Sequence, residues 1–244
     1  INLAPANLMK EGSHFDLAIT LTILAALKIF PEKKIKEYLI SSELSLDGSL
    51  NRVNGILPTA ILANKLNKGL ICAKENLAEA AISGNKNIAS FSNLLEVINF
   101  FRSDDIVIAS NYTKPKMRQE ESTNFKDIIG LKEAKRAFEI AAVGKHNILM
   151  IGAPGSGKSM LASAFKSILP DLTNNELLET AIVKSVVQEH GNNDFFSFPF
   201  RSPHHNCSAA ALTGGGSKIT PGEITKAHNG ILFLDELPEY RRDA

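Results

Sequence analysis

The order of apolar and polar positions predicts helices mixed with strands over about the first hundred residues. Residues 15–29 are apolar on all sides of a helical projection and Pro31 follows, so this segment predicts a buried helix. Two apolar segments, 39–46 and 50–53, flank Asp47-Gly48-Ser49. Because an Asp-Gly pair supplies the positive φ angles of a tight turn, these segments predict a β-hairpin.

The remaining apolar segments of this part complete an α/β unit. The expected elements are a strand over 69–73 and helices over 55–66, 76–82 and 93–101. After residue 102 the apolar period disappears, and charged residues accumulate around a proline. We therefore predict a first domain of residues 1–102 and a linker of residues 103–120.

Beyond the linker, the pattern is typical of a parallel sheet between helices. Residues 131–142 predict a helix, and residues 147–151 predict an apolar strand that leads into a glycine loop and a second helix. A strand that is apolar on both faces and joined to helices at both ends belongs to a parallel sheet. Thr173 and Glu176 form a capping box for the next helix. Residues 121–244 are thus predicted to form a second α/β domain.

Composition limits the function without naming one. The chain has 244 residues, 44% of them hydrophobic and 22% charged, with a net charge of +1, so it is globular and carries no basic nucleic-acid arm. Cys72 and Cys207 show no metal-finger spacing, which argues against a secreted disulfide scaffold or a zinc module and favours the cytoplasm. The longest apolar stretch, residues 17–27, is well short of the ~20 residues that cross a bilayer. We expect no membrane partner.

Residues 152–159 carry the clearest chemical signal. The sequence Gly152-Ala153-Pro154-Gly155-Ser156-Gly157-Lys158-Ser159 matches the pattern GxxxxGK[ST] between a strand and a helix. Glycines at this spacing let backbone N–H groups turn toward phosphate oxygens, and the helix N-terminus adds its positive dipole. Lys158 is expected to reach the β and γ phosphates, and the Ser159 hydroxyl to complete a Mg²⁺ shell. The segment predicts a P-loop that binds ATP.

A second apolar strand, residues 231–234, ends in two carboxylates. Asp235 is expected to hold Mg²⁺, directly or through water, and Glu236 to polarise the attacking water as the catalytic base, with Lys158 as the other catalytic residue. An apolar strand ending in Asp-Glu is common by itself. Because it follows a glycine loop in the same domain, the two motifs together predict a P-loop ATPase.

Other stretches resemble a known family. Residues 125–131 look like the adenine-side segment of AAA+ ATPases, which implies that Ile128 and Ile129, with Met160 after the loop, contact the nucleotide. Four further stretches resemble magnesium-chelatase-like AAA+ proteins of the ComM/YifB family: residues 199–205, 214–216, 221–224 and 227–231. Residues 46–50, 53–58 and 74–76 resemble the family's N-terminal domain. That domain is itself similar to part of the Lon protease domain.

The resemblance implies a fold: a small Lon-like, ribosomal-S5-like α/β domain followed by an incomplete P-loop AAA+ core. It also raises proteolysis as an alternative, because Lon uses a serine nucleophile activated by a lysine. Alignment with the Lon nucleophile loop puts His14 at the serine position, beside Ser13, and alignment with the lysine loop puts Leu57 at the lysine position. We therefore expect no peptidase activity.

Two polar segments of the second domain invite other interpretations. A metal site at His204-His205, with Cys207 and His190, lacks the usual ligand spacing and is disfavoured. The family resemblance implies instead a polar loop that faces the ring pore or a neighbouring subunit. The resemblance suggests that the glycine-rich segment 214–222 is a hairpin that moves against a substrate; a plain surface loop is the alternative. Arg201, Lys218 and Lys226 lie near these loops, where they are weak candidates for phosphate contacts.

For the full-length family member, the resemblance implies a homo-oligomeric ring, expected as a hexamer, that uses ATP and Mg²⁺ to remodel DNA, as in branch migration linked to natural transformation. The alternatives are a magnesium-chelatase-type motor subunit and a non-catalytic nucleotide-binding fragment. The chain starts at Ile1 and stops eight residues after Glu236, so we expect that both ends are cuts. Without the sensors, arginine finger and lid that follow in AAA+ proteins, we expect ATP binding with little hydrolysis.

Overall fold

The structure is a computed structural model that describes residues 12–103, 123–187, 195–216 and 219–240. The chain forms two compact units, one of residues 1–114 and 185–193 and one of residues 115–184 and 194–244. The predicted linker of residues 103–120 lies outside the described residues except for Ser103, so the limits expected from the sequence stay a prediction. Within the described ranges, no helix is both long and apolar enough to cross a bilayer.

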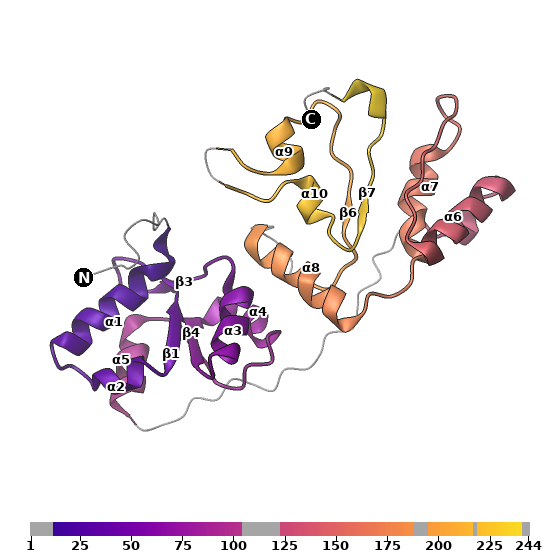
Figure 1. Ribbon diagram of the computed structural model, residues 1–244. Helices are drawn as coiled ribbons and strands as arrows, with labels where there is room; N and C mark the ends of the chain where they lie inside the picture. The colour runs from indigo at the N-terminus through magenta and orange to yellow at the C-terminus, as the bar shows by residue number, and fades with distance from the viewer. Residues whose placement is uncertain (1–11, 104–122, 188–194, 217–218, 241–244) are drawn as a thin grey trace. The chain divides into compact units, whose positions relative to one another are not determined.

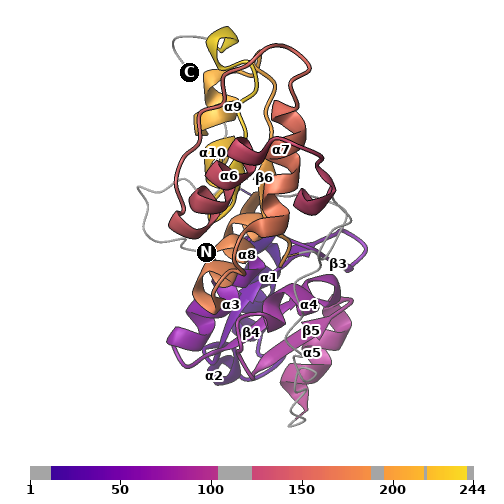
Figure 2. The ribbon, with the colours of Figure 1, turned by 90° about the vertical axis from the view of Figure 1, so that its right-hand side faces the viewer.

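The first unit is a parallel sheet between two helical layers (Figure 1). Its strands follow the order β1, β4, β5, with Tyr38 beside Gly69 and Leu70 beside Ile88, and β4 and β5 can be followed side by side in Figure 2. The elements of this sheet and its helices are β1 (Tyr38–Ser41), β4 (Gly69–Ala73), β5 (Ile88–Phe91), α1 (Asp16–Ala26), α2 (Glu32–Ile35), α3 (Ile56–Lys65), α4 (Leu77–Ala81) and α5 (Leu94–Arg102). Single helical turns flank α1 and α4 at η1 (Ser13–Phe15) and η2 (Lys74–Asn76).

Strand β4 explains why this unit has two cores. Successive side chains of a strand point to opposite faces of its sheet. Ile71 and Ala73 therefore pack with α1 and α5, whereas Leu70 and Cys72 pack with α3 and α4. Burial on both faces accounts for the continuous apolar run from which this strand was predicted. Burial also raises the pKa of the Cys72 thiol to about 12, which favours the neutral thiol of a core residue.

The predicted hairpin forms only over residues 43–51, because residues 39–41 of its expected first strand belong to β1, which pairs with β4 in the parallel sheet. The predicted first helix is also corrected. Strands β2 (Glu43–Leu44) and β3 (Leu50–Asn51) pair in antiparallel fashion, and Asp47 Oδ1 accepts hydrogen bonds from the Ser49 N–H and hydroxyl at 2.9 and 2.7 Å. Helix α1 ends at Ala26, and it is not buried all round, since Thr22 and Ile23 are exposed. It lies on one face of the sheet, and one stripe of side chains is enough to cover that face.

The second unit contains helices around a short parallel strand pair, in which Phe200 lies beside Ile231 and Arg201 beside Leu232. Its elements are η3 (Phe125–Asp127), α6 (Lys132–Gly144), α7 (Lys158–Phe165), η4 (Lys166–Ile168), α8 (Asn174–Val187, up to Lys184 in this unit), β6 (Phe200–Arg201), α9 (Ala209–Thr213), α10 (Glu223–Lys226), β7 (Ile231–Leu232) and η5 (Leu237–Glu239). The predicted capping box is present, because Glu176 Oε2 accepts from the Thr173 N–H at 2.8 Å. With parallel pairing in both units, the predicted α/β class is confirmed.

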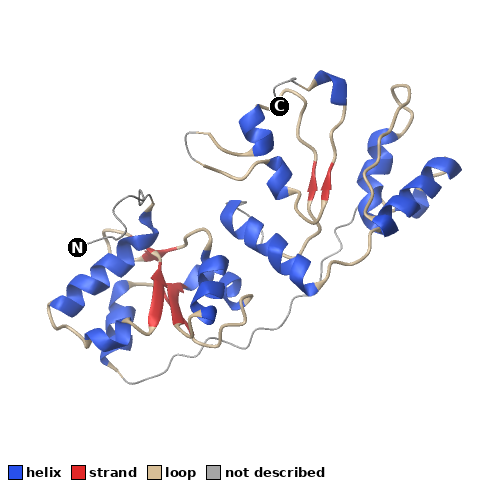
Figure 3. Ribbon diagram, in the orientation of Figure 1, coloured by secondary structure: helices blue, strands red, loops and turns tan. Residues whose placement is uncertain are grey.

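The strand predicted at residues 147–151 does not form within the described part of the chain (Figure 3). Ile148 and Met150 pack against the core of Phe125, Phe138 and Leu161, while Leu149 and Ile151 are 73% and 90% exposed. A strand exists through hydrogen bonds to a neighbour, and the described strands of this unit, β6 and β7, pair with each other. The segment therefore has no strand partner among the described residues. The second predicted strand, 231–234, is shorter than expected and ends at Leu232.

Candidate nucleotide-binding site

The glycine loop has the backbone shape that a phosphate cradle needs. Gly155 and Gly157 have φ angles of +75° and +89°, a region that residues with a Cβ seldom enter. Gly157 immediately precedes α7, and its carbonyl accepts the Leu161 N–H at 2.9 Å, so the loop runs directly into the helix. The first N–H groups of a helix have no partner within it, so they are free to bind an anion at this end.

Lys158 lies over the loop that it is expected to serve. Its ammonium Nζ donates to the carbonyl oxygens of Gly152 and Ala153 at 2.9 and 3.0 Å. These contacts hold the charge above the loop rather than out in solvent. A phosphate in the loop would be a stronger acceptor than either carbonyl, because its oxygens carry the negative charge that an ammonium attracts.

The two sequence motifs meet through one hydrogen bond. Ser159 Oγ, in the first turn of α7, donates to Asp235 Oδ2 at 2.9 Å, although 76 residues separate them. The other oxygen of Asp235 accepts the N–H of Glu236 at 3.0 Å, which fixes the orientation of the carboxylate. A hydroxyl and a carboxylate are the hard oxygen ligands that Mg²⁺ prefers, so the residues present fit this ion.

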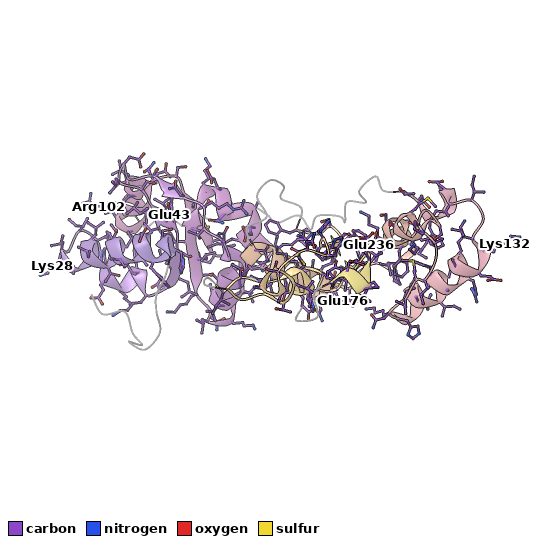
Figure 4. All side chains as sticks on the ribbon, turned by 90° about the horizontal axis from the view of Figure 1, so that it is seen from above. Lys28, Glu43, Arg102, Lys132, Glu176 and Glu236 are labelled. Carbon is purple, nitrogen blue, oxygen red and sulfur yellow. The ribbon has the colours of Figure 1, made fainter. Side chains whose placement is uncertain are left out.

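Glu236 follows β7 with an unusual backbone. Its φ angle is +53°, and it lies just before η5 in the C-terminal part of the chain, where Figure 4 labels it. Its side chain is 64% exposed, and Oε2 lies 3.1 Å from Nδ1 of His205. The predicted catalytic carboxylate is therefore next to the predicted Mg²⁺ ligand Asp235 and is held by a histidine from the segment that follows β6.

The residues expected on the adenine side lie in different environments. Ile128 is buried with Phe125 in the core of the second unit, while Ile129 is 94% exposed. Met160 is also exposed, and a Cβ at Gly157 would lie 3.4 Å from its Cε and 3.6 Å from Cδ1 of Leu131. Met160 and Leu131 thus present apolar surface beside the glycine loop. Leu131 closes the segment that resembles the adenine side, but it was not among the residues expected to contact the nucleotide; its signal is an apolar residue directly after Gly130 and before a helix.

The cations considered for DNA contacts are engaged in the structure. Arg201 binds the Glu223 carboxylate with two nitrogens, Nε at 2.6 Å and Nη2 at 3.0 Å, and Lys226 Nζ contacts the same carboxylate at 3.0 Å. The hydrogen bond from Arg201, with a further one from Lys226, lowers the pKa of Glu223 below its usual value. Arg201 and Lys226 are therefore largely neutralised locally, whereas Lys218 lies outside the described residues.

The base of the glycine-rich loop, residues 214–222, is closed by backbone contacts. The Gly215 N–H donates to the Thr220 carbonyl at 3.0 Å. A Cβ at Gly222 would lie 2.2 Å from the Gly214 nitrogen and 2.4 Å from the Leu212 oxygen, so only glycine fits there. Residues 217–218 lie outside the described part, and Ile219 beside them is fully exposed. The geometry defines a loop with a fixed base and an exposed apolar residue.

Neither the metal interpretation of the histidine pair nor the peptidase interpretation gains support. Within the described residues, no group of three or more His, Cys, Asp or Glu side chains is placed to hold a metal ion, and His190 lies outside them. The His204 and His205 rings instead pack together with centroids 4.1 Å apart. Ser13 donates its hydroxyl to Glu43, and Leu57, at the Lon lysine position, is fully buried.

Comparison with known sequences identifies the family. Residues 124–244 match the family described as "Magnesium chelatase, subunit ChlI", and residues 1–76 match the family described as "Subunit ChlI of Mg-chelatase". The chain is thus a magnesium-chelatase-like protein.

Within that class, the chain belongs to the ComM/YifB family. It is 43% identical to "Competence protein ComM" of Haemophilus influenzae and 42% identical to "Uncharacterized protein YifB" of Escherichia coli, over 99% of this chain and 48% of each relative. The chain therefore spans about half the length of these curated relatives. A "Magnesium-chelatase 67 kDa subunit" of Chlorobaculum parvum is 31% identical over 46% of this chain and 16% of that protein.

Proposed function

We propose that the chain binds ATP or ADP together with Mg²⁺ at residues 152–159. The observation that carries the proposal is the 2.9 Å contact between Ser159 Oγ and Asp235 Oδ2. Either motif alone is also compatible with an ordinary structural feature: the glycine loop with a tight turn, and the Asp-Glu pair with an acidic surface. A hydroxyl and a carboxylate that meet beside an exposed helix N-terminus and a lysine form the set of groups that a metal-bound triphosphate requires.

Each part of the site has a distinct role in this proposal. The backbone N–H groups of the loop and the Lys158 ammonium bind phosphate oxygens, and Met160 and Leu131 offer apolar contacts for the base. Ser159 and Asp235 would hold Mg²⁺, which when bound neutralises phosphate charge and orients the chain of phosphates. Ile129 is a further candidate for the adenine side because it is exposed, whereas Ile128 acts through the core.

We further propose that the full-length gene product hydrolyses ATP. Glu236 accepts a proton from water as the water oxygen bonds to the γ phosphorus. The bond from that phosphorus to the β–γ bridging oxygen breaks, and its electron pair leaves with ADP. Inorganic phosphate is released, and the proton passes from Glu236 to solvent. Groups from a neighbouring copy would stabilise the remaining negative charge of the transition state. We propose that these copies form a homo-oligomeric ring, a hexamer, and that the ring is cytoplasmic.

Removal of the Ser159 or Asp235 oxygen tests the Mg²⁺ part of the site. Nucleotide affinity is measured with Mg²⁺ and with EDTA for Ser159→Ala, Asp235→Asn and the double variant. We expect the increase in nucleotide affinity that Mg²⁺ causes to be about tenfold smaller in each single variant than in the unchanged chain. The double variant should lose little more, because both groups act on one ion. Asp171→Asn, at an exposed aspartate outside the loop, is the matched control. If Mg²⁺ raises nucleotide affinity in both single variants as much as in the unchanged chain, Ser159 and Asp235 do not bind the ion.

We propose DNA as the substrate that the full-length ring remodels, with a chelatase-type motor as the alternative. The support is the extent of similarity: the relatives named ComM and YifB match 99% of this chain, whereas the chelatase subunit matches 46%. Both family descriptions name a chelatase subunit, so descriptions alone do not separate the two functions. A ring that collects a few cations from each copy can present a basic channel although one chain carries only +1.

Salt dependence distinguishes these substrates. For the ATP-bound oligomer of the full-length gene product, we expect DNA affinity to fall steeply with ionic strength, with a smaller slope for Lys218→Ala. Lys226→Ala is the internal control, because Glu223 already holds that ammonium at 3.0 Å and its loss should change the slope little. An oligomer without a salt slope, or with the same slope after loss of Lys218, would favour the chelatase-type motor.

A further inference from the structure

His205 is better fixed than the carboxylate that it contacts. Its side chain is 24% exposed, against 64% for Glu236. Its ring packs on His204, with centroids 4.1 Å apart, and lies edge-on to Tyr240 at 6.5 Å. A long, exposed glutamate side chain samples many rotamers unless a partner restrains it. The half-buried imidazole supplies such a restraint.

The segment that carries His205 is itself fastened to the segment that carries Glu236. The Tyr240 hydroxyl donates to the Pro203 carbonyl at 2.6 Å, so the chain after β7 is tied to the chain after β6. These strands are parallel and adjacent, so both segments leave the same edge of the sheet. The contact between Nδ1 of His205 and Oε2 of Glu236 therefore joins two anchored segments.

We infer that His205 is a positioning residue for Glu236. Its Nδ1 holds Oε2 at 3.1 Å, and Oε1 of Glu236 has no hydrogen-bond partner among the described residues. One oxygen is thus fixed while the other is left to accept the proton of water. This inference rests on the proposed function, in which Glu236 is the base. It assigns no proton transfer to His205, which acts by fixing the direction of the carboxylate.

Two substitutions of His205 separate positioning from bulk. The amide nitrogen of asparagine is as many bonds from Cα as Nδ1 is, whereas the amide nitrogen of glutamine corresponds to Nε2. Asparagine can therefore replace the observed contact, and glutamine cannot reach it in the same geometry. In the full-length gene product we expect kcat to fall about tenfold to a hundredfold for His205→Ala and His205→Gln, with KM unchanged, because a misdirected base costs turnover and not binding. His205→Asn should restore most of kcat.

The chain offers a matched control for loss of a histidine–glutamate pair. His228 Nε2 also lies 3.1 Å from a carboxylate oxygen, that of Glu179, and both side chains are exposed. His228→Ala should leave kcat unchanged, so a loss specific to His205 cannot come from a missing surface pair. Thermal unfolding and nucleotide affinity are measured for every variant. If His205→Ala does not fold, the kcat values of His205→Asn and His205→Gln test the inference instead.

The outcomes distinguish this inference from the proposal beneath it. If Glu236→Gln turns over like the unchanged protein, Glu236 is not the base, and both fail. If Glu236→Gln is inactive while His205→Ala and His205→Gln keep full kcat, only the inference fails. A higher kcat in His205→Ala would also overturn it, because the histidine would then restrain the base. Support requires loss of kcat in both variants, rescue by asparagine, and no further loss when His205→Ala is added to Glu236→Gln.

Discussion

Lys158→Ala should lower the affinity for ATP and ADP by about tenfold to a hundredfold, the loss expected for a charge-assisted contact to phosphate. The ammonium already lies over the loop, at 2.9 and 3.0 Å from the Gly152 and Ala153 carbonyls. Bound phosphates would replace these weak acceptors with charged ones. Titration of a fluorescent ATP analogue, checked by calorimetry, measures the change.

Lys132→Ala is the control for a general change in charge, because Lys132 is the first residue of α6 and is exposed. Its affinity should match that of the unchanged chain. Equal affinities for Lys158→Ala and the unchanged chain would contradict the site, since Lys158 is the main side-chain charge near the loop. Thermal unfolding shows whether the variant keeps its fold, which we expect because the loop is a surface feature.

The sequence was most informative where local chemistry is sufficient. The capping box at Thr173 and Glu176 needs only residues three positions apart, and its hydrogen bonds are present. The hairpin depended on Asp47 and the glycine after it, and β4 on five apolar residues that are buried on both faces. Each of these signals is contained in a few consecutive residues.

Elements that depend on a distant partner could not be predicted as well. Residues 147–151 have strand composition, but an apolar run does not specify which strand pairs with it, and here β6 and β7 pair with each other. Strand β5 was missed because Ala89 and Ser90 weaken its apolar signal, although its position beside β4 buries it. Tertiary context decides both cases.

The same distinction applies to the candidate site. The glycine loop and the Asp-Glu pair were selected from local patterns, but their approach through Ser159 and Asp235 is a contact across 76 residues. The pair of His205 and Glu236 had no sequence signal at all, since the two residues lie 31 positions apart in the chain. Ile128 illustrates the reverse case, because a residue that matches a family motif is buried in the core.

Glu236→Gln in the full-length gene product should lower ATP turnover by about a hundredfold to ten-thousandfold, the usual contribution of a general base. Glutamine has the same shape but does not accept a proton at neutral pH. The contact with Nδ1 of His205, now at 3.1 Å, can be kept by the amide oxygen. Nucleotide affinity should therefore stay within about twofold, because the change affects only the transition state.

Phosphate release and nucleotide binding are measured on the same samples, so that lost catalysis is separated from lost binding. Glu239→Gln is the matched control, three positions further on in η5, and its turnover should equal that of the unchanged protein. A parallel fall in affinity would mean that Glu236 supports the loop and not the reaction. If Glu236→Gln retains turnover while Asp235→Asn loses it, Asp235 is still supported as the metal ligand. In that case Glu236 is not the proton acceptor, and another residue must be the base.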